Sequence, residues 1–535
     1  MHTRMRRLAA LLLALILLLT GCHLEVPTYM KMLVASMVPT HFSEMEYTRP
    51  DVPELLNALE TCTADAPEAD FDTLAGEINQ CLLMFNEYLT NYNLSNIRYY
   101  TDMTDIYWSE EYNYCLDYNS EISAAVDQML YALADSPHRE ALESYEYFGP
   151  GYFDAYEGES LWDETFTALM DQEAELLTTY YDLSAQATEA EDQEFYDVYA
   201  PQLAQILIDL VILRQEIAAY AGFESFNDFA FDFYFLRDYT PEQEADYLAQ
   251  VRQELVPIYK DLFYLGMPEI NIYSRTEGET FAYVESLAEN MGGMVLEAFQ
   301  LMEECGLYDI SYSENKYDAS FEVYLPLYNE PYVFLNPSQS DYDFLAFAHE
   351  FGHFCNDYAS YGTGASVDVA EVFSQGMEYL SLCYAETDNS LEALQMVSSL
   401  SVFVEQSAYA DFELRLYSMA PGELTVDGVF ALFEEVGAEY GFDLWGLDGR
   451  QVVTIPHFYI APCYVFSYVV SNDAALQLYQ LEQAETGAGL AKYQENLYPM
   501  EITFLAFLES AGLESPFAEG RISDVAATFR EALGY

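Results

Sequence analysis

The chain has 535 residues, of which 91 are acidic and 18 are basic, so its formal net charge is −73 at pH 7. A field of this sign repels nucleic acid and anionic membrane surfaces, which excludes nucleic-acid binding as a function and favours a monomer. Hydrophobic residues make up 52% of the chain and aromatic residues 16%. That content excludes a disordered chain and predicts a large buried core.

The first 22 residues have the pattern of a secretory signal. Three arginines between Arg4 and Arg7 precede an apolar run over residues 8–18, and Leu19-Thr20-Gly21-Cys22 follows. The apolar run is too short to favour a transmembrane anchor. The pattern closely resembles a bacterial lipoprotein signal (residues 1–21), which implies that Cys22 becomes the lipid-modified N-terminus. We therefore expect a protein on the bacterial cell surface, lipid-anchored on the extracytoplasmic face of the membrane and touching it only through that anchor.

Residues 22–45 are mixed in character and predict a tether. Helical periodicity dominates from Pro53 onward, which favours a mostly α fold and argues against a parallel α/β sheet. Helix start signals are Pro53 after Asp51, Thr240-Pro241-Glu242 and Pro421-Gly422-Glu423. The clearest periodic segments are Leu55–Leu59, Phe71–Leu89, Ile122–Leu133, Leu161–Tyr181 and Tyr196–Ala219.

Seven cysteines follow Cys22, at irregular spacing. An odd number with no pattern argues against a disulfide framework. A disulfide bond between Cys62 and Cys81 is possible, and the sequence does not decide it.

Two short β-prone runs lie in the middle of the chain. Residues 320–327 and 332–335 flank Tyr328-Asn329-Glu330-Pro331, which predicts a hairpin. Beside a metal site, an edge strand can bind an extended peptide through main-chain hydrogen bonds. A purely structural hairpin is the equal alternative.

The segment Ala348–Phe354 carries the strongest chemical signal. His349 and His353, four residues apart, project from one face of a helix and can reach one metal ion, with Glu350 beside it. This is the pattern of a zinc hydrolase, although a chance match on a buried helix is the alternative. Catalytic zinc takes three protein ligands, and Glu371 is the candidate for the third. Gly352 is costly inside a helix, which suggests the close approach of another backbone.

Glu371 and Glu378 share a helix face because they are seven residues apart. One of them can bind the metal, while the other can form a hydrogen bond to a side chain that binds the metal. In a chain with 91 acidic residues, the alternative is an ordinary solvated face.

His457 lies in an apolar, aromatic stretch with Tyr464 and Tyr468. A lone histidine there is more often a core residue. Hydrolysis of an amide creates an oxyanion, however, and His and Tyr side chains can stabilise it in a dry site. Which tyrosine acts stays open.

These motifs together resemble the thimet oligopeptidase and oligoendopeptidase F family of zinc metallopeptidases, nearest to its Pz-peptidase-like bacterial branch. The resemblance rests on His349–His353, Val369–Ser374 and Pro456–Tyr468, and extends to Arg237–Pro241 and Ala511–Phe517. It covers about residues 196–535, the expected zinc metallopeptidase domain. Residues 46–195 form an expected N-terminal helical region.

The resemblance implies a large helical ellipsoid with a deep substrate channel and a small hairpin beside the zinc helix. It implies one Zn²⁺ held by His349, His353 and Glu371, with Glu378 behind them and Glu350 as the catalytic base. The expected activity is hydrolysis of internal bonds in short, unstructured peptides. The alternatives are a metallocarboxypeptidase or dipeptidyl carboxypeptidase, and a lipid-anchored peptide-binding protein without catalysis.

Overall fold

The computed structural model of the protein describes residues 39–144, 148–149, 151–156, 158, 160–187, 190, 192–265, 272–362, 364–385, 389–499 and 501–534. The expected signal segment, Cys22 and most of the tether lie outside these residues. Within them, no helix combines the length and apolar character needed to cross a membrane.

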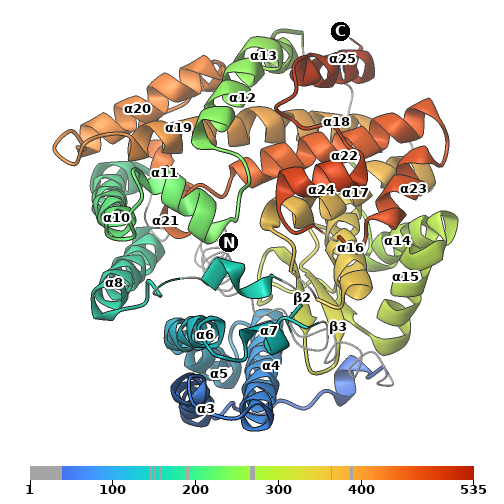
Figure 1. The fold of residues 1–535 in the computed structure, drawn as a ribbon. Helices are drawn as coiled ribbons and strands as arrows, with labels where there is room; N and C mark the ends of the chain where they lie inside the picture. The colour runs from blue at the N-terminus through green and yellow to red at the C-terminus, as the bar shows by residue number, and fades with distance from the viewer. Residues whose placement is uncertain are drawn as a thin grey trace.

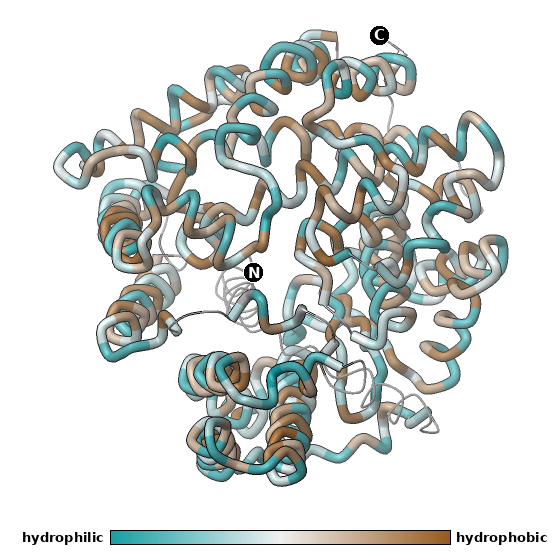
Figure 2. The backbone as a smooth tube through the Cα atoms, viewed as in Figure 1, coloured by the Kyte–Doolittle hydropathy of each residue, from teal (hydrophilic) through white to brown (hydrophobic). Residues whose placement is uncertain are grey.

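The fold is mostly helical with one small sheet, as predicted, and Figure 1 shows the helices in chain order. Brown and teal alternate along the helices in Figure 2, as expected for amphipathic helices with one apolar face each. The helices of the first part are α3 (Val52–Asp65), α4 (Phe71–Thr101), α5 (Ile106–Asp117), α6 (Asn119–Ala134), α7 (Arg139–Leu142), α8 (Glu164–Ala187) and α9 (Asp192–Glu194).

The second part starts with a π-helical turn, η3 (Phe195–Tyr199), that runs into α10. Two further π-helical turns are η4 (Ala230–Tyr234) and η5 (Val402–Gln406). The helices are α10 (Ala200–Tyr220), α11 (Phe226–Phe229), α12 (Pro241–Glu254), α13 (Val256–Leu265), α14 (Glu277–Met291), α15 (Gly293–Cys305), α16 (Tyr342–Ser360), α17 (Val367–Tyr384), α18 (Asn389–Ser401), α19 (Ser407–Tyr417), α20 (Val426–Glu439), α21 (His457–Ile460), α22 (Phe466–Ala484), α23 (Ala488–Glu495), α24 (Phe504–Ala511) and α25 (Arg521–Leu533).

Local capping chemistry explains where several helices begin. The Asp51 side chain accepts a hydrogen bond from the backbone N–H of Glu54 at the start of α3, and Thr240 forms a capping box at the start of α12. Both starts were predicted. The predicted start at residues 421–423 is too early, because the hydroxyl of Thr425 caps α20.

The predicted hairpin is present, with its turn earlier than expected. Strands β2 (Ser320–Leu325) and β3 (Glu330–Leu335) pair antiparallel, with Ser320 opposite Leu335 and Leu325 opposite Glu330. The turn is therefore residues 326–329, and Glu330 already belongs to β3. Strand β1 (Tyr308–Asp309) pairs parallel with the other side of β3. The order β1-β3-β2 leaves β2 at the edge of this sheet.

Helix α17 packs between α16 and α22 at the centre, and β2 and β3 lie against α16 (Figure 1). An added Cβ at Gly352 in α16 would lie 2.5 Å from the carbonyl oxygen of Phe373 and 2.6 Å from the Cα of Ser374 in α17. The expected close approach of a second backbone at Gly352 is thus confirmed. Cys62 and Cys81 are both buried free thiols.

Candidate metal centre

The two motif histidines lie on one face of α16, with their ring centroids 5.0 Å apart. Their side chains are 22% and 20% exposed, so both are accessible from one side, while most other residues of the helix are buried. Glu350 between them is only 5% exposed. A helix buried on nearly every face holds these side chains in fixed directions.

Glu371 in α17 completes a three-residue cluster. Its Oε2 lies 3.4 Å from Nε2 of His349 and 3.7 Å from Nε2 of His353. One potential ligand atom from each residue falls within 4.8 Å of the other two. Two imidazoles and a carboxylate form a donor set that suits Zn²⁺. The contact at Gly352 brings α17 close enough for Glu371 to reach the histidines.

Glu378 lies behind this cluster. Its Oε1 accepts a hydrogen bond of 2.6 Å from Nδ1 of His349, and its Oε2 accepts one from Gln395. Such a bond fixes the orientation of a ligating histidine and leaves Nε2 free to bind a metal. The geometry therefore gives Glu371 and Glu378 the different places that were expected, while their roles stay predictions.

Two further hydrogen bonds orient the Glu371 carboxylate. Ser374 donates to its Oε2 at 2.8 Å, and Tyr464 donates to its Oε1 at 3.3 Å. Both contacts are buried. A carboxylate held at both oxygens by donors loses little conformational freedom when it binds a cation.

The electrostatics of the cluster favour positive charge. Burial would lower the pKa of His349, but the hydrogen bond to Glu378 and the charge of Glu371 raise it to about 10. Burial lowers the pKa of His353 to about 4, so it stays neutral. Burial raises the pKa of Glu350 to about 7. The cluster thus stabilises one positive charge, as a cation site should.

The predicted oxyanion residues lie together beside the cluster. The ring of His457 is 6.1 Å from that of Tyr464 and 6.2 Å from that of Tyr468, and the two tyrosine rings are 5.1 Å apart. Nε2 of His457 is buried and has no hydrogen-bond partner. Burial lowers the pKa of His457 to about 4, so the ring is neutral at pH 7.

A cavity of about 370 Å³ connects these groups. It is lined by His349, Glu378, His457 and Tyr468, among others. Three glutamines also line it, and each has a buried Oε1 without a hydrogen-bond partner (Gln375, Gln395 and Gln406). Unpaired buried acceptors are costly. They make the cavity suitable for a ligand rich in N–H donors.

Two buried arginines, for which the sequence indicates no role, hold the His457 segment in place. Arg214 in α10 donates to the carbonyl oxygens of Phe458 and Tyr459. Arg237 donates to the carbonyl oxygen of Cys463 at 2.9 Å and is nearly buried. Basic residues are rare in this chain, which has only 18, and both arginines lie in apolar stretches. That combination is the sequence signal that could have indicated a buried structural role.

Comparison with known proteins agrees with this architecture. Residues 42–160 match the family model described as the Peptidase M3 N-terminal domain. No curated protein matches the chain in sequence.

Solved structures share the fold over almost the whole chain. A protein described as oligoendopeptidase F superposes with a TM-score of 0.77 at 20% identity, covering 92% of this chain and 99% of that one. Pz peptidase A, solved with an inhibitor, gives 0.78 at 18% identity with the same coverage. A Bacillus anthracis protein described as oligoendopeptidase F gives 0.75 at 20% identity, covering 93% and 99%. At these identities the likeness establishes the fold.

The fold, the matched N-terminal domain and the cluster of two histidines and a glutamate together support an enzyme of the metallo-oligopeptidase class. The neighbours' names place the fold among oligoendopeptidase F and Pz peptidase structures.

Proposed function

We propose that the protein is a zinc-dependent oligoendopeptidase that hydrolyses internal bonds of short, unstructured peptides. The observation that carries this proposal is the convergence of His349, His353 and Glu371 beside Glu350 and the unpaired Nε2 of His457. A protein that only captured peptides would need neither the cluster nor Glu350.

The donor set fits one Zn²⁺ ion. His349 is oriented by Glu378, and both oxygens of Glu371 are held by hydroxyl donors. These are the supporting bonds that a catalytic zinc site requires. When bound, zinc supplies a Lewis acid that polarises a peptide carbonyl and acidifies water.

The chain's own residues carry the proton transfers. Glu350 accepts a proton from the attacking water and delivers it to the leaving amine, a role worth ~10²–10⁴-fold in rate. Neutral His457 donates a hydrogen bond to the oxyanion of the tetrahedral intermediate. Tyr468 lines the cavity, whereas the hydroxyl of Tyr464 already donates to Glu371. Tyr468 is therefore the better second donor to the oxyanion.

Two features support an extended peptide as substrate. The edge strand β2 packs on α16, and a strand edge binds an extended peptide through main-chain hydrogen bonds. The unpaired oxygens of the three glutamines in the cavity accept hydrogen bonds from peptide N–H groups. Both contacts recognise the backbone and demand little of the side chains.

The test uses Glu350→Gln and a quenched peptide that is blocked at both ends, so that only internal cleavage gives a signal. We expect the variant to keep one zinc ion and to lose at least ~10²-fold in kcat, because Gln cannot accept the proton. Glu303→Gln, an exposed substitution on α15, serves as the matched control. Retained turnover in Glu350→Gln, or failure of the wild type to cleave the blocked peptide, would sink the proposal.

We also propose that Cys22 anchors the protein by a lipid on the extracytoplasmic face of a bacterial membrane, from the sequence pattern alone. Cys22→Ser should move the protein from the membrane fraction into the medium or leave it as an unprocessed precursor. Membrane association that is unchanged, with residues 1–21 still removed, would contradict the anchor.

A further inference from the structure

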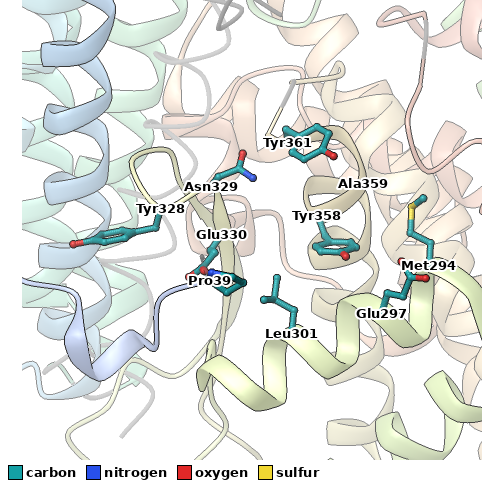
Figure 3. Close-up of a pocket in the computed structure, with 10 residues that line it drawn as sticks. All are labelled: Pro39, Met294, Glu297, Leu301, Tyr328, Asn329, Glu330, Tyr358, Ala359 and Tyr361. Carbon is teal, nitrogen blue, oxygen red and sulfur yellow. The ribbon is translucent and has the colours of Figure 1, made fainter. Parts of the chain in front are cut away.

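A second pocket, separate from the metal cavity, lies where the hairpin turn, α15 and the C-terminal end of α16 meet (Figure 3). Its volume is about 320 Å³. Its ten lining residues are those labelled in Figure 3, and neither Lys nor Arg is among them. None of the ten lines the metal cavity or belongs to the metal cluster.

One wall of this pocket holds a buried carboxylate with one oxygen that has no hydrogen-bond partner. Glu330, the first residue of β3, is 2% exposed. Its Oε1 accepts a hydrogen bond of 2.7 Å from the backbone N–H of Thr40, but its Oε2 is buried with no partner. Burial raises the pKa of Glu330 to about 7. A buried carboxylate of this kind is costly unless a donor or a positive charge reaches it.

The remaining walls favour a cation. Glu297 on α15 adds a second carboxylate, and Tyr358 and Tyr361 supply phenol oxygens and ring faces, to which cations are attracted. The side chains of Met294 and Leu301 provide an apolar surface on the same side as Glu297 (Figure 3).

We propose that this pocket binds an alkylammonium ion, supplied either by a lysine side chain of a peptide or protein or by a free aliphatic diamine. The ammonium group has three N–H donors, enough for Glu330 Oε2 and the neighbouring oxygens, and its aliphatic stem lies along Met294 and Leu301. A calcium or magnesium ion would make no use of the apolar surface of Met294 and Leu301, whereas an alkylammonium ion uses both the carboxylates and that surface. The negative charge of the walls excludes an anion.

The experiment titrates the zinc-loaded full chain with two probes, 1,5-diaminopentane and Nα-acetyl-lysine methylamide, by calorimetry. It is run at pH 8, where Glu330 is ionised, and at physiological salt, where weak surface binding is screened. We expect one site for at least one probe and a loss of at least tenfold in affinity in Glu330→Gln. The variant keeps an oxygen that can accept from Thr40, so its fold should be preserved.

Controls separate this pocket from the rest of the acidic surface. Glu303→Gln on α15 removes the same charge outside the pocket and should change affinity less than twofold, as should Glu350→Gln in the metal centre. Glu297→Gln should weaken binding, and it tests the site even if Glu330→Gln fails to fold. 1-Pentanol, which lacks the charge, should not bind.

Each outcome decides a point. Binding of the diamine alone identifies a small-molecule site, and binding of the lysine derivative alone identifies a site for protein or peptide side chains. Binding of both shows that the ammonium group and its stem suffice. The proposal would be overturned if neither probe bound. It would also be overturned if the wild type, Glu330→Gln and Glu297→Gln all bound with equal affinity.

Discussion

Replacing Gly352 by alanine tests whether the contact between α16 and α17 sets the geometry of the metal cluster. The added Cβ would lie 2.6 Å from the Cα of Ser374, about 1 Å closer than the favourable carbon–carbon distance of ~3.5 Å. The neighbouring atoms are backbone, so α17 must move rather than rotate a side chain. Overpacking of this kind costs about 1–3 kcal/mol, against a gain of about 1 kcal/mol in helix propensity. We expect a net loss of stability.

The same shift should reach the metal site. Glu371 lies in α17, and its Oε2 is 3.4 and 3.7 Å from the two histidine nitrogens of α16. Moving the helices apart by on the order of 1 Å opens this cluster, and we expect zinc affinity to fall roughly tenfold or more, as when a supporting contact is lost.

The assay combines denaturant unfolding of the zinc-free protein with zinc affinity measured by competition with a chelator. Gly76→Ala is the matched control, because Gly76 is exposed inside α4 and an added Cβ there meets nothing within 4 Å. It should raise stability by about 0.5–1 kcal/mol and leave zinc affinity unchanged. If Gly352→Ala behaved like Gly76→Ala in both measurements, the reasoning would be refuted.

Three other predictions concern single side chains. In zinc titrations, Glu371→Ala should lose far more affinity than the ~10–100-fold expected for Glu378→Ala, and equal losses would contradict the assignment. Tyr468→Phe should lower kcat by ~10²-fold with little change in zinc affinity, whereas Tyr464→Phe should mainly weaken zinc binding; the reverse pattern would exchange their roles. Burial raises the pKa of Asp127 to about 6 from its usual 3.8, so the folded protein binds more protons and loses stability as pH rises from 4 to 6. Asp127→Asn should therefore gain up to about 3 kcal/mol relative to wild type above pH 6 and nothing below pH 4, and a difference that does not vary with pH in urea unfolding would argue against it.

Much of the site could be predicted because its signals are local. The spacing of His349 and His353 fixes their common helix face, and a glycine inside that helix indicated the approach of α17. The caps at Asp51 and Thr240 likewise depend only on neighbouring residues. The start of α20 was misplaced because Pro421 and Thr425 are both acceptable start signals, and only the hydroxyl of Thr425 reaches a free N–H.

The interactions that sequence analysis missed join distant parts of the chain. No local pattern shows that Arg214 reaches the carbonyl oxygens after His457, or that Tyr464 donates to Glu371 while Tyr468 faces the cavity. These depend on how α10, α17 and α22 cross in space. The π-helical turns are a further miss, since helical periodicity does not distinguish them from α-helix.

The two arginines also bear on when the site can form during folding. Arg214 is 244 residues from Phe458, and Arg237 is 226 residues from Cys463. Closing loops of this length is entropically costly, and such contacts form slowly relative to local helices. The His457 segment is held in place only after the segments that carry Arg214 and Arg237 have packed against it. If His457 acts as the proposed oxyanion donor, an incompletely folded chain lacks it, and hydrolysis begins only with the completed fold.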